Sequence, residues 1–422
     1  MLADLLGTRR LTASETTVTD CLSNQLAVES MFTVGVQVID TASSNCNATR
    51  EEVCQYLADA AEALNIDVIC EPNYAMQLDA SSEESFLSNG RAASELSALG
   101  VNDRFASEQW NLERIGMKEA WEALEDQRLR DVVVAVVDTG VEYEHEDLVG
   151  SMMYRDGEIL GYDFVKWERN PYDSHGHGTR CAGIIAAQTN NTLGVAGIAP
   201  VKIIPIKIFF DSGGTFLDKV LFGLELAMLL GANVSVTSYR FEGRSEALKS
   251  AAERASQRGH LIIAAPGITI PGKELNVNSS SPCSLAAELP VLCVASTNKR
   301  DEISRFSNYA NFTHIVAPGE YVYSTSIGNT YTSHLGSSVP ASHVAGVAAL
   351  LFGLGLTLPE VVETLLDSSD DVVKFRNGTA FPYAGRLNAG RAVRQALARQ
   401  STTASPSTTT TTPTTVGTPT KS

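Results

Sequence analysis

Nearly unbroken apolar runs separated by amphipathic stretches dominate the chain between residues 107 and 395. Such runs are typical of strands in a parallel sheet covered on both faces, since neither side of the strand meets water. The stretches between them have helical spacing. The pattern predicts a doubly wound α/β fold, with a mostly parallel sheet flanked by helices and sites at the carboxyl ends of its strands. The predicted strands are 131–137, 202–209, 233–239 and 260–265, and the predicted helices are 178–187, 217–230 and 245–258.

A smaller α+β pattern precedes this region. Residues 32–39 alternate like a strand, residues 50–64 have helical spacing with acidic residues in the first turn, and residues 66–70 predict a second strand. A unit of about fifty residues gains stability from docking on a partner, because it buries little core of its own. Two stretches predict no packed structure: a Ser-, Glu- and Gly-rich linker at 80–100 and a Thr- and Pro-rich tail at 401–422.

The charge balance narrows the classes of partner. The 422 residues include 49 acidic and 32 basic side chains, which gives a formal net charge of −17. This balance argues against nucleic acid or an anionic membrane as the main partner. The apolar run at 220–232 is too short to span a bilayer, so we expect a soluble protein without a membrane span.

Cysteines and glycosylation triplets favour a secreted glycoprotein, although the N-terminus shows no evident signal peptide. The cysteines form no CxxC pair, which argues against a zinc site, and their odd number leaves a free thiol in a monomer, the state we expect. The four N-terminal cysteines and the last two are candidates for disulfides, but their pairing stays open. The cysteines are Cys21, Cys46, Cys54, Cys70, Cys181, Cys283 and Cys293, and the triplets begin at Asn47, Asn190, Asn233, Asn278, Asn311 and Asn377.

Three chemically capable side chains fall at the ends of predicted elements. Asp138 follows an apolar strand, His177 begins a helix, and Ser338 opens the last core helix. Side chains in these places can converge above the sheet, where the histidine would take the serine proton and the aspartate would orient the histidine. Taken singly, each has a structural interpretation, as a turn residue or a helix cap. His175 and Ser337 are the neighbouring alternatives.

The segments around these residues resemble the Asp, His and Ser boxes of subtilisin-like serine proteases, in that family's order. They read VVDTGVEYEHEDL, HGTRCAG and GSSVPASHVAG, and the last of them aligns the nucleophile with Ser338. The resemblance extends over roughly residues 30–395, and EPNYAMQL at 71–78 is similar to the end of an inhibitor I9-like propeptide. The supporting segments are 107–121, 190–200, 305–319 and 324–336.

The resemblance implies a serine endopeptidase made as a zymogen. Its parts would be an N-terminal extension (1–29), a propeptide that inhibits its own enzyme (30–79), a processing linker (80–106), a catalytic domain (107–395) and a disordered tail (396–422). Peptide or protein substrates would bind by strand addition. The implied oxyanion and substrate-binding residues are Ser238, Tyr239, Arg240, Ala265, Pro266 and Gly267.

The resemblance also implies a structural calcium ion. Family members often bind one through an early Gln, an Asp after the catalytic Asp, and the loop after the His helix. Oxygen ligands on a loop suit a hard cation. The alternative is a loop without an ion, beside a glycosylated Asn190. The matching side chains are Gln109, Asp147 and Asn191, with backbone carbonyls from Thr189, Leu193 and Val195.

The chain departs from the family pattern in three places. Pro266 and Gly267 stand where the family has Gly and Asn, so the side-chain amide that completes the oxyanion hole is missing. Arg240 replaces a glycine on the strand that pairs with substrate. A cation there either narrows the cleft or selects acidic residues by charge pairing. Pro340, in the first turn of the last core helix, is a mild change.

These departures leave other hypotheses open. One is a catalytically inactive pseudoprotease that acts as a peptide-binding module, and another is an esterase that uses the same three residues. Cys181, one helical turn from His177, gives a weaker cysteine-protease interpretation. Kexin-like and proteinase K-like enzymes carry an unpaired structural cysteine at the matching position, which favours a structural thiol here.

Overall fold

A seven-stranded sheet forms the centre of the computed structural model, which describes residues 27–31, 36–40, 49–64, 68–78, 97–278 and 280–403. The strand order is β14-β13-β12-β10-β4-β8-β7, and every neighbouring pair is parallel. This arrangement confirms the predicted fold class. The strands are β4 (Val133–Asp138), β7 (Tyr162–Asp163), β8 (Lys202–Lys207), β10 (Val234–Thr237), β12 (Leu261–Ala264), β13 (Val291–Thr297) and β14 (Ile315–Pro318).

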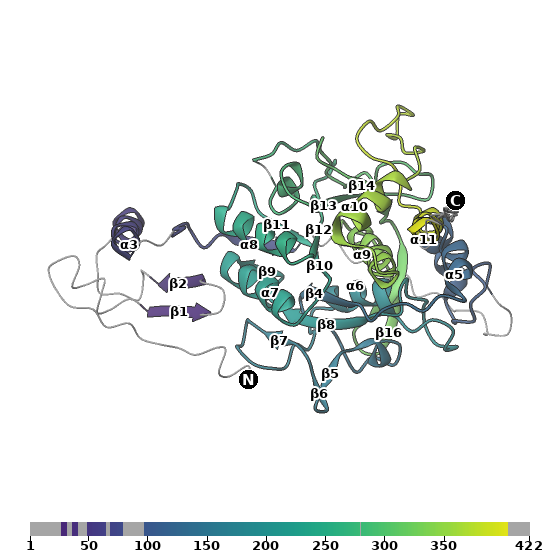
Figure 1. The fold of residues 1–422 in the computed structure, drawn as a ribbon, viewed down its shortest axis with the longest axis horizontal. Helices are drawn as coiled ribbons and strands as arrows, with labels where there is room; N and C mark the ends of the chain where they lie inside the picture. The colour runs from purple at the N-terminus through teal and green to yellow at the C-terminus, as the bar shows by residue number, and fades with distance from the viewer. Residues whose placement is uncertain are drawn as a thin grey trace, which may run out of the picture.

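Helices cover both faces of this sheet (Figure 1). Alternate residues of β4 point to opposite faces: Val134 and Val136 pack in one core cluster with α6 and α9, and Ala135 and Val137 pack in the other with α7 and α8. This double burial explains why the strands are apolar throughout. The helices are α6 (His177–Ala186), α7 (Leu217–Leu229), α8 (Glu246–Gln257), α9 (Ser338–Gly353) and α10 (Leu358–Asp367).

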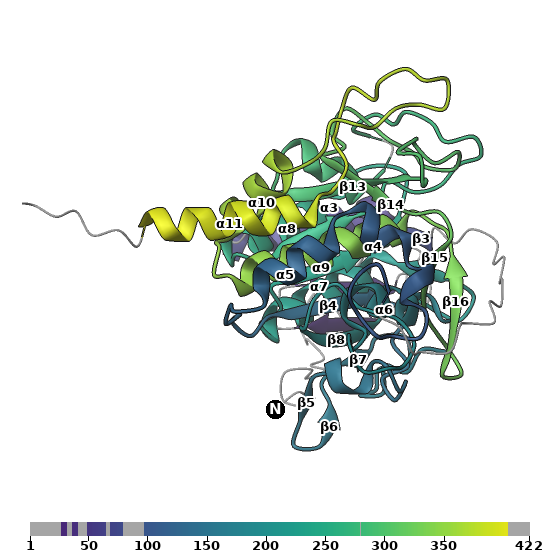
Figure 2. The ribbon, with the colours of Figure 1, turned by 90° about the vertical axis from the view of Figure 1, so that its right-hand side faces the viewer.

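The remaining elements surround this core. Helix α5 lies alongside α11, the last helix in the described part of the chain (Figure 2). Strands β1 and β2 pair as an antiparallel ribbon, as do β5 with β6 and β15 with β16. The other helices are α3 (Arg50–Leu64), α4 (Trp110–Arg114), α5 (Met117–Leu124), α11 (Ala389–Thr403) and the 3-10 turns η1 (Ala106–Glu108), η2 (Val149–Ser151) and η3 (Cys283–Ala287). The other strands are β1 (Ala27–Met31), β2 (Val36–Asp40), β3 (Ala75–Leu78), β5 (Tyr154–Arg155), β6 (Glu158–Ile159), β9 (Gly214–Phe216), β11 (Tyr239–Arg240), β15 (Val322–Ser326) and β16 (Thr330–His334).

Two local predictions differ from the structure. The strand predicted at 66–70 is wrong over residues 68–70, which have no regular structure and expose Val68 and Ile69. Cys70 there forms a disulfide with Cys54 of α3, so a covalent link stabilises this short segment instead of a strand ladder. Helix α11 continues past residue 395 to Thr403, because its apolar side packs on α5. The linker predicted at 80–100 lies mostly outside the described residues, and the tail beyond Thr403 does so entirely.

The structure shows which of the described cysteines are paired, and whether any described helix could span a membrane. Cys283 pairs with Cys293, and Cys181 is free and buried. Cys21 and Cys46 lie outside the described residues. Among the helices of the described part of the chain, none combines the length and the apolar character needed to cross a bilayer.

Candidate active site

Three neighbouring elements bring together the side chains at positions 138, 177 and 338. Asp138 ends β4, His177 begins α6 and Ser338 begins α9. His177 Nδ1 lies 2.7 Å from Asp138 Oδ1, and His177 Nε2 lies 2.9 Å from Ser338 Oγ. All three residues are buried, with Ser338 5% exposed. The carboxylate, imidazole and hydroxyl therefore form one continuous hydrogen-bonded chain.

Asp138 is held in its ionised form despite its burial. Burial alone would raise the pKa of this carboxyl. The charge and hydrogen bond of His177, together with the Thr139 N–H (2.7 Å), outweigh that effect, so the pKa is lowered. An ionised carboxylate on Nδ1 fixes the histidine tautomer that leaves Nε2 facing Ser338.

A tight loop positions His177 at the helix start. The Asp173 carboxylate accepts hydrogen bonds from the backbone N–H groups of residues 175, 176 and 179, and from the Thr179 hydroxyl. Gly178 lies so close to the Gly140 carbonyl that a Cβ there would overlap it. The glycine after the histidine therefore lets α6 approach the loop that follows β4.

The neighbouring alternatives do not take part in this chain. The Ser337 hydroxyl is buried and makes no hydrogen bond to any described residue, so neither a nucleophilic nor a capping role is visible for it. The His175 ring centroid lies 6.4 Å from that of His177, and burial lowers the pKa of His175. His177 and Ser338 are thus the members of these two pairs that contact each other.

Cys181 lies beneath the histidine, with its Sγ within 4.8 Å of ligand atoms on Asp138 and His177. Burial, aided by the charge of Asp138, raises the pKa of this thiol to about 12. A thiol held neutral is a poor nucleophile and a poor metal ligand. The geometry therefore favours the structural interpretation of Cys181.

The opposite wall of the site consists of Ser238 with β11, and of the segment that follows β12. Ser238 and Tyr239 are fully buried, and the Tyr239 ring packs in the core. Ala265 N–H donates to the Thr237 carbonyl (3.3 Å), which joins the two segments. The Arg240 side chain lies against Gly267, so that a Cβ on Gly267 would overlap Arg240 Cδ and Nε.

An asparagine distant in sequence supports this wall. Asn308 Nδ2 donates to the Pro266 carbonyl (3.4 Å), and Asn308 N–H donates to the Gly267 carbonyl (3.1 Å). Its side-chain oxygen accepts the Lys273 N–H (3.1 Å) and the Thr269 hydroxyl (2.5 Å). Asn308 thus holds the loop in place, and its amide does not replace the missing amide at position 267. The sequence carried no signal for this contact.

The chain's own strand β3 lies in a three-stranded sheet with β9 and β11. β3 pairs antiparallel with β9 on one side and β11 on the other. Gln77 is opposite both Gly214 and Arg240, and Leu78 N–H donates to the Gly213 carbonyl (2.9 Å). Met76 is 2% exposed and packs into the core cluster of α7 and α8. Residues 75–78 therefore fill the groove as an added strand.

Comparisons with known proteins place this site in a family. Residues 130–381 match the model of the subtilase family, peptidase S8. The chain belongs to the subtilase family. Thermitase from Thermoactinomyces vulgaris is 34% identical over 291 residues, which cover 68% of this chain and 97% of thermitase. A thermophilic serine proteinase from Bacillus sp. (strain AK1) is 35% identical over 261 residues, which cover 62% of this chain and 61% of that protein.

A solved structure supports the same assignment. The crystal structure of a cold adapted subtilisin-like serine proteinase matches this subtilase with a TM-score of 0.54 and 27% sequence identity. The match covers 66% of this chain and 97% of that one. By family and fold, the protein is a subtilisin-like serine endopeptidase.

The predicted calcium ligands of the subtilase lie around the loop after α6. Asp147 is buried, and its carboxylate accepts hydrogen bonds from Asn191 Nδ2 (2.7 Å) and Val195 N–H (2.9 Å). Burial, aided by the charges of Asp103 and Glu146, raises the pKa of Asp147 to about 6. The loop therefore holds a carboxylate that is costly to ionise without a cation.

The other predicted ligands have protein partners. Both side-chain atoms of Gln109 bond to the Ala196 backbone (2.8 Å each), and Thr189 Oγ1 donates to the Gly197 carbonyl (3.0 Å). The Leu193 carbonyl accepts the Arg104 N–H (2.9 Å). Sequence reasoning missed Asp103, whose carboxylate accepts the N–H groups of residues 190 (3.0 Å) and 191 (3.3 Å).

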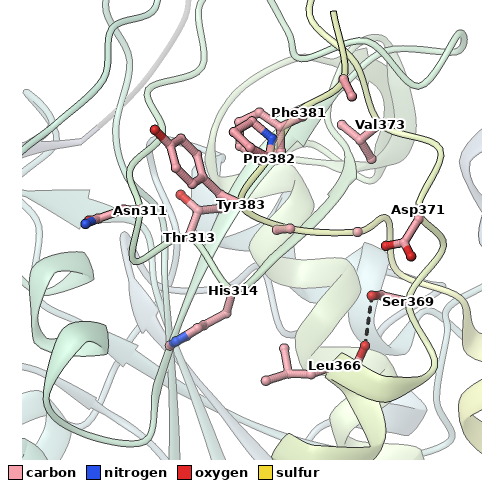
Figure 3. A pocket seen from close by; sticks show the side chains of 13 residues that line it. Asn311, Thr313, His314, Leu366, Ser369, Asp371, Val373, Phe381, Pro382 and Tyr383 are labelled. Atoms are coloured by element: carbon pink, nitrogen blue, oxygen red, sulfur yellow. Dashed lines mark hydrogen bonds between the residues drawn. The ribbon is translucent and has the colours of Figure 1, made fainter.

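A pocket of about 500 Å³ lies apart from the groove of the subtilase, near the start of β14 (Figure 3). Figure 3 shows Phe381, Pro382 and Tyr383 along one wall, with His314 and Asp371 on other parts of the lining. The Ser369 hydroxyl donates to the Leu366 carbonyl at its edge (2.8 Å). The lining shares no residue with the groove, so we assign it no step in peptide hydrolysis.

Proposed function

We propose that Asp138, His177 and Ser338 are the catalytic triad of this endopeptidase. The observation that carries the proposal is the hydrogen-bonded chain from Asp138 Oδ1 through the His177 ring to Ser338 Oγ (2.7 and 2.9 Å). His177 Nε2 takes the serine proton as Oγ attacks the peptide carbonyl carbon, and then gives it to the departing amine. Water, activated by the same nitrogen, releases the acyl group from Ser338.

The oxyanion hole is the weak part of this machinery. Ser338 is the first residue of α9, so unpaired N–H groups at that helix start face the developing negative charge. Gly267 has no side chain to add a second, side-chain donor, and the Asn308 amide is engaged with Pro266. We therefore expect turnover below that of a family member with the complete hole.

The enzyme is made as a zymogen, with residues 30–79 as its inhibitory propeptide. Strand β3 occupies the groove where a substrate strand would bind. Two preceding side chains anchor it on the enzyme's helices. The Glu71 carboxylate accepts the Glu246 N–H (3.0 Å) in the first turn of α8, and the Asn73 amide exchanges hydrogen bonds with Asp218 (2.9 and 3.0 Å) in the first turn of α7. Processing then cuts the linker at 80–106.

A structural calcium ion fits the loop after α6. Asp147, Asn191 and the Val195 backbone meet there, and the buried Asp147 carboxylate has no ion-pair partner among the described residues. Asp147 and Asn191 would hold the ion with carbonyl oxygens of the loop, while Gln109 stays engaged with Ala196. The bound cation would neutralise the carboxylate and fix the loop that continues from the histidine helix.

Secretion and glycosylation complete the proposal. The described disulfides are of the kind that persists in oxidising compartments. Four of the glycosylation triplets start at exposed asparagines, where an oligosaccharide has room: Asn190, Asn278, Asn311 and Asn377. We expect a monomer that cleaves peptide or protein substrates.

A fluorophosphonate probe tests the catalytic assignment. The processed enzyme should be labelled, Ser338→Ala should lose the label, and Ser337→Ala should keep it, because the Ser337 hydroxyl contacts no catalytic group. The unprocessed chain should label slowly, since β3 fills the groove. No label on the processed wild type would overturn the proposal and favour the inactive peptide-binding alternative.

A further inference from the structure

The groove wall opposite Ser338 carries a cation. Arg240 belongs to β11, and its side chain crosses to the segment after β12, where Cδ and Nε lie against Gly267. The side chain is 21% exposed, so most of it is already shielded from water. Its ion-pair contact with Glu242 is long, at 3.9 Å, and Glu242 is 78% exposed. Water screens such a contact strongly, so the pair contributes little to stability.

The register of β3 shows which substrate residue meets this arginine. Gln77 lies opposite Arg240 and Leu78 lies opposite Tyr239, so the next residue of a bound strand lies opposite Ser238. Side chains alternate between the faces of a strand, and directly opposite residues share a face. The residue opposite Ser238 therefore projects on the same face as Arg240. It is a diagonal neighbour of that side chain, whereas Gln77 is the directly opposite one, and both lie within reach of a long arginine.

The end of β3 also lies close to the triad histidine. A Cβ built on Gly213 would be 3.8 Å from Leu78 Cδ1 and 3.9 Å from His175 Nε2, so β3 ends beside the loop that carries the triad histidine. A strand that continues one residue past Leu78 thus presents its carbonyl to the triad and its side chain to Arg240.

We propose that Arg240 makes this enzyme select substrates with Asp or Glu immediately before the cleaved bond. The inference rests on the proposed catalytic function and deepens it. Substrate binding would remove part of the remaining water around Arg240, and a lower local dielectric strengthens its attraction for a carboxylate on the substrate. An acidic side chain forms a charge-assisted, bidentate pair there, whereas a lysine is repelled. Gly267 makes the pocket possible, because any side chain there would displace the arginine.

The sequence of the chain agrees with this preference. The residue that follows Leu78 is Asp79, which lies outside the described residues. A strand in the observed register would offer that aspartate to Arg240 when the enzyme processes itself. The proposal therefore predicts cleavage of the bond after Asp79, at the edge of the processing linker, to leave a mature chain that begins with Ala80.

Matched peptides test the proposal on the processed enzyme. The series Ala-Met-Gln-Leu-X-p-nitroanilide, with X as Asp, Asn, Leu or Lys, differs only at the residue in question. Wild type should cleave the Asp peptide at least about tenfold better in kcat/KM than the isosteric Asn peptide. Arg240→Gln should bring that ratio close to one, and Arg240→Glu should move the preference toward Lys. Salt should reduce the wild-type ratio, because the arginine is partly exposed.

Controls separate this inference from the function on which it rests. Arg244→Gln removes a cation from the loop after β11 that is paired with Glu288 (2.8 Å), and it should leave the Asp-to-Asn ratio unchanged. Equal cleavage of the Asp and Asn peptides by wild type overturns the inference alone. So does an equal loss on all peptides in Arg240→Gln, which would make the arginine an oxyanion donor. Absence of both cleavage and fluorophosphonate labelling overturns the proposed function as well.

Self-processing gives an independent readout in the full chain. Asp79→Asn should slow maturation at least about tenfold, and Glu83→Gln, which removes a linker carboxylate four residues later, should not. Mass spectrometry of the wild-type product should place the new N-terminus at Ala80. Maturation of Asp79→Asn at the wild-type rate contradicts the proposal.

Discussion

The two walls of the groove follow the subtilase pattern to different degrees. On one wall, β4, α6 and α9 place Asp138, His177 and Ser338 within 2.7 and 2.9 Å of their partners. On the other wall, Arg240 and Gly267 stand where the resemblance to subtilisin-like proteases leads us to expect glycine and asparagine. We call the first side, with Asp138, His177 and Ser338, the proton-transfer wall, and the second side, with Arg240 and Gly267, the substrate-facing wall. The residues of the first wall follow the family pattern, and those of the second do not.

Arg240 and Gly267 depend on each other structurally. Arg240 fits only because Gly267 has no side chain, since a Cβ at 267 would overlap Cδ and Nε of the arginine. The positive φ of Gly267 (87°) reinforces this preference for glycine. The loss of the oxyanion amide and the gain of a cation are thus coupled by packing. Substitutions on each wall should have separable effects.

The largest effect should come from the proton-transfer wall. Asp138→Asn keeps the size of the side chain but removes the charge that fixes the histidine tautomer, so kcat should fall by about 10⁴-fold. Steady-state hydrolysis of the Asp peptide measures it. Asp156→Asn, an exposed acidic residue between β5 and β6, is the control and should retain full activity. A loss below tenfold in Asp138→Asn would mean that another group orients His177.

Each wall has a buried, neutral histidine on or beside an element that supports it. His343, on the helix of Ser338, bonds to the Val339 carbonyl (2.8 Å) and to Asn111 Nδ2 (2.8 Å). His260, just before β12, bonds to the Ala232 carbonyl (2.7 Å) and to the Ser235 hydroxyl (2.8 Å). Burial lowers the pKa of each histidine to about 4.

Acid should therefore destabilise both walls. A histidine whose folded pKa lies below its unfolded value of about 6.5 contributes stability above pH 6.5, and that contribution is lost as the pH falls toward 4. Each group should account for about 3 kcal/mol of the free energy of unfolding. Urea unfolding of the Ser338→Ala protein at pH 7 and pH 4.5 measures it, and His343→Gln or His260→Gln should each make the pH dependence shallower. An unchanged slope in either variant would show that its histidine also binds a proton in the folded protein, so that its pKa is not lowered there.

A mutant cycle across positions 240 and 267 should show the packing between the two departures directly. Gly267→Asn alone should lower activity, because the new side chain collides with Arg240. Combined with Arg240→Gly, it restores an oxyanion amide, so kcat on a neutral peptide should rise about tenfold to a hundredfold above Arg240→Gly alone. Equal effects of Gly267→Asn in both backgrounds would contradict the coupling.

This coupling marks the limit of what the sequence could predict. The fold class followed from apolar runs, because a strand buried on both faces has a recognisable composition. The three triad positions were predicted from the ends of elements together with the resemblance of their segments to the Asp, His and Ser boxes of subtilisin-like proteases. The contact between Arg240 and Gly267, the support from Asn308 and the loop contact of Asp103 join segments far apart in the chain, and no local pattern encodes such contacts. The strand predicted at 66–70 is wrong over residues 68–70, where a disulfide that the apolar pattern did not reveal joins Cys70 to Cys54.

Removal of the proposed calcium ion should affect the proton-transfer wall, because the loop that would hold the ion continues from the histidine helix. A site saturated a hundredfold above its Kd contributes about 2.7 kcal/mol, so chelation should lower the melting temperature by about 5 °C. Asp147→Asn should abolish the calcium dependence of the melt. Glu158→Gln, on the exposed β6 strand, should leave it intact. A melt of the wild type that does not move on chelation would contradict the calcium assignment.

The smallest effects should come from the anchors of β3, which test whether its two neighbouring strands, β9 and β11, hold it equally. Asn73 bonds to α7, behind β9, and Glu71 bonds to α8, behind β11. Loss of one cap costs about 1 kcal/mol, so Asn73→Ala or Glu71→Ala should speed hydrogen exchange of the Leu78 amide about fivefold in unprocessed Ser338→Ala protein. Gln55→Ala, on the exposed side of α3, should leave that rate unchanged. Faster exchange in Asn73→Ala alone would show that the β9 side holds the strand. Equal acceleration in both variants would show that β11, which carries Arg240, holds the peptide backbone as firmly as β9 does.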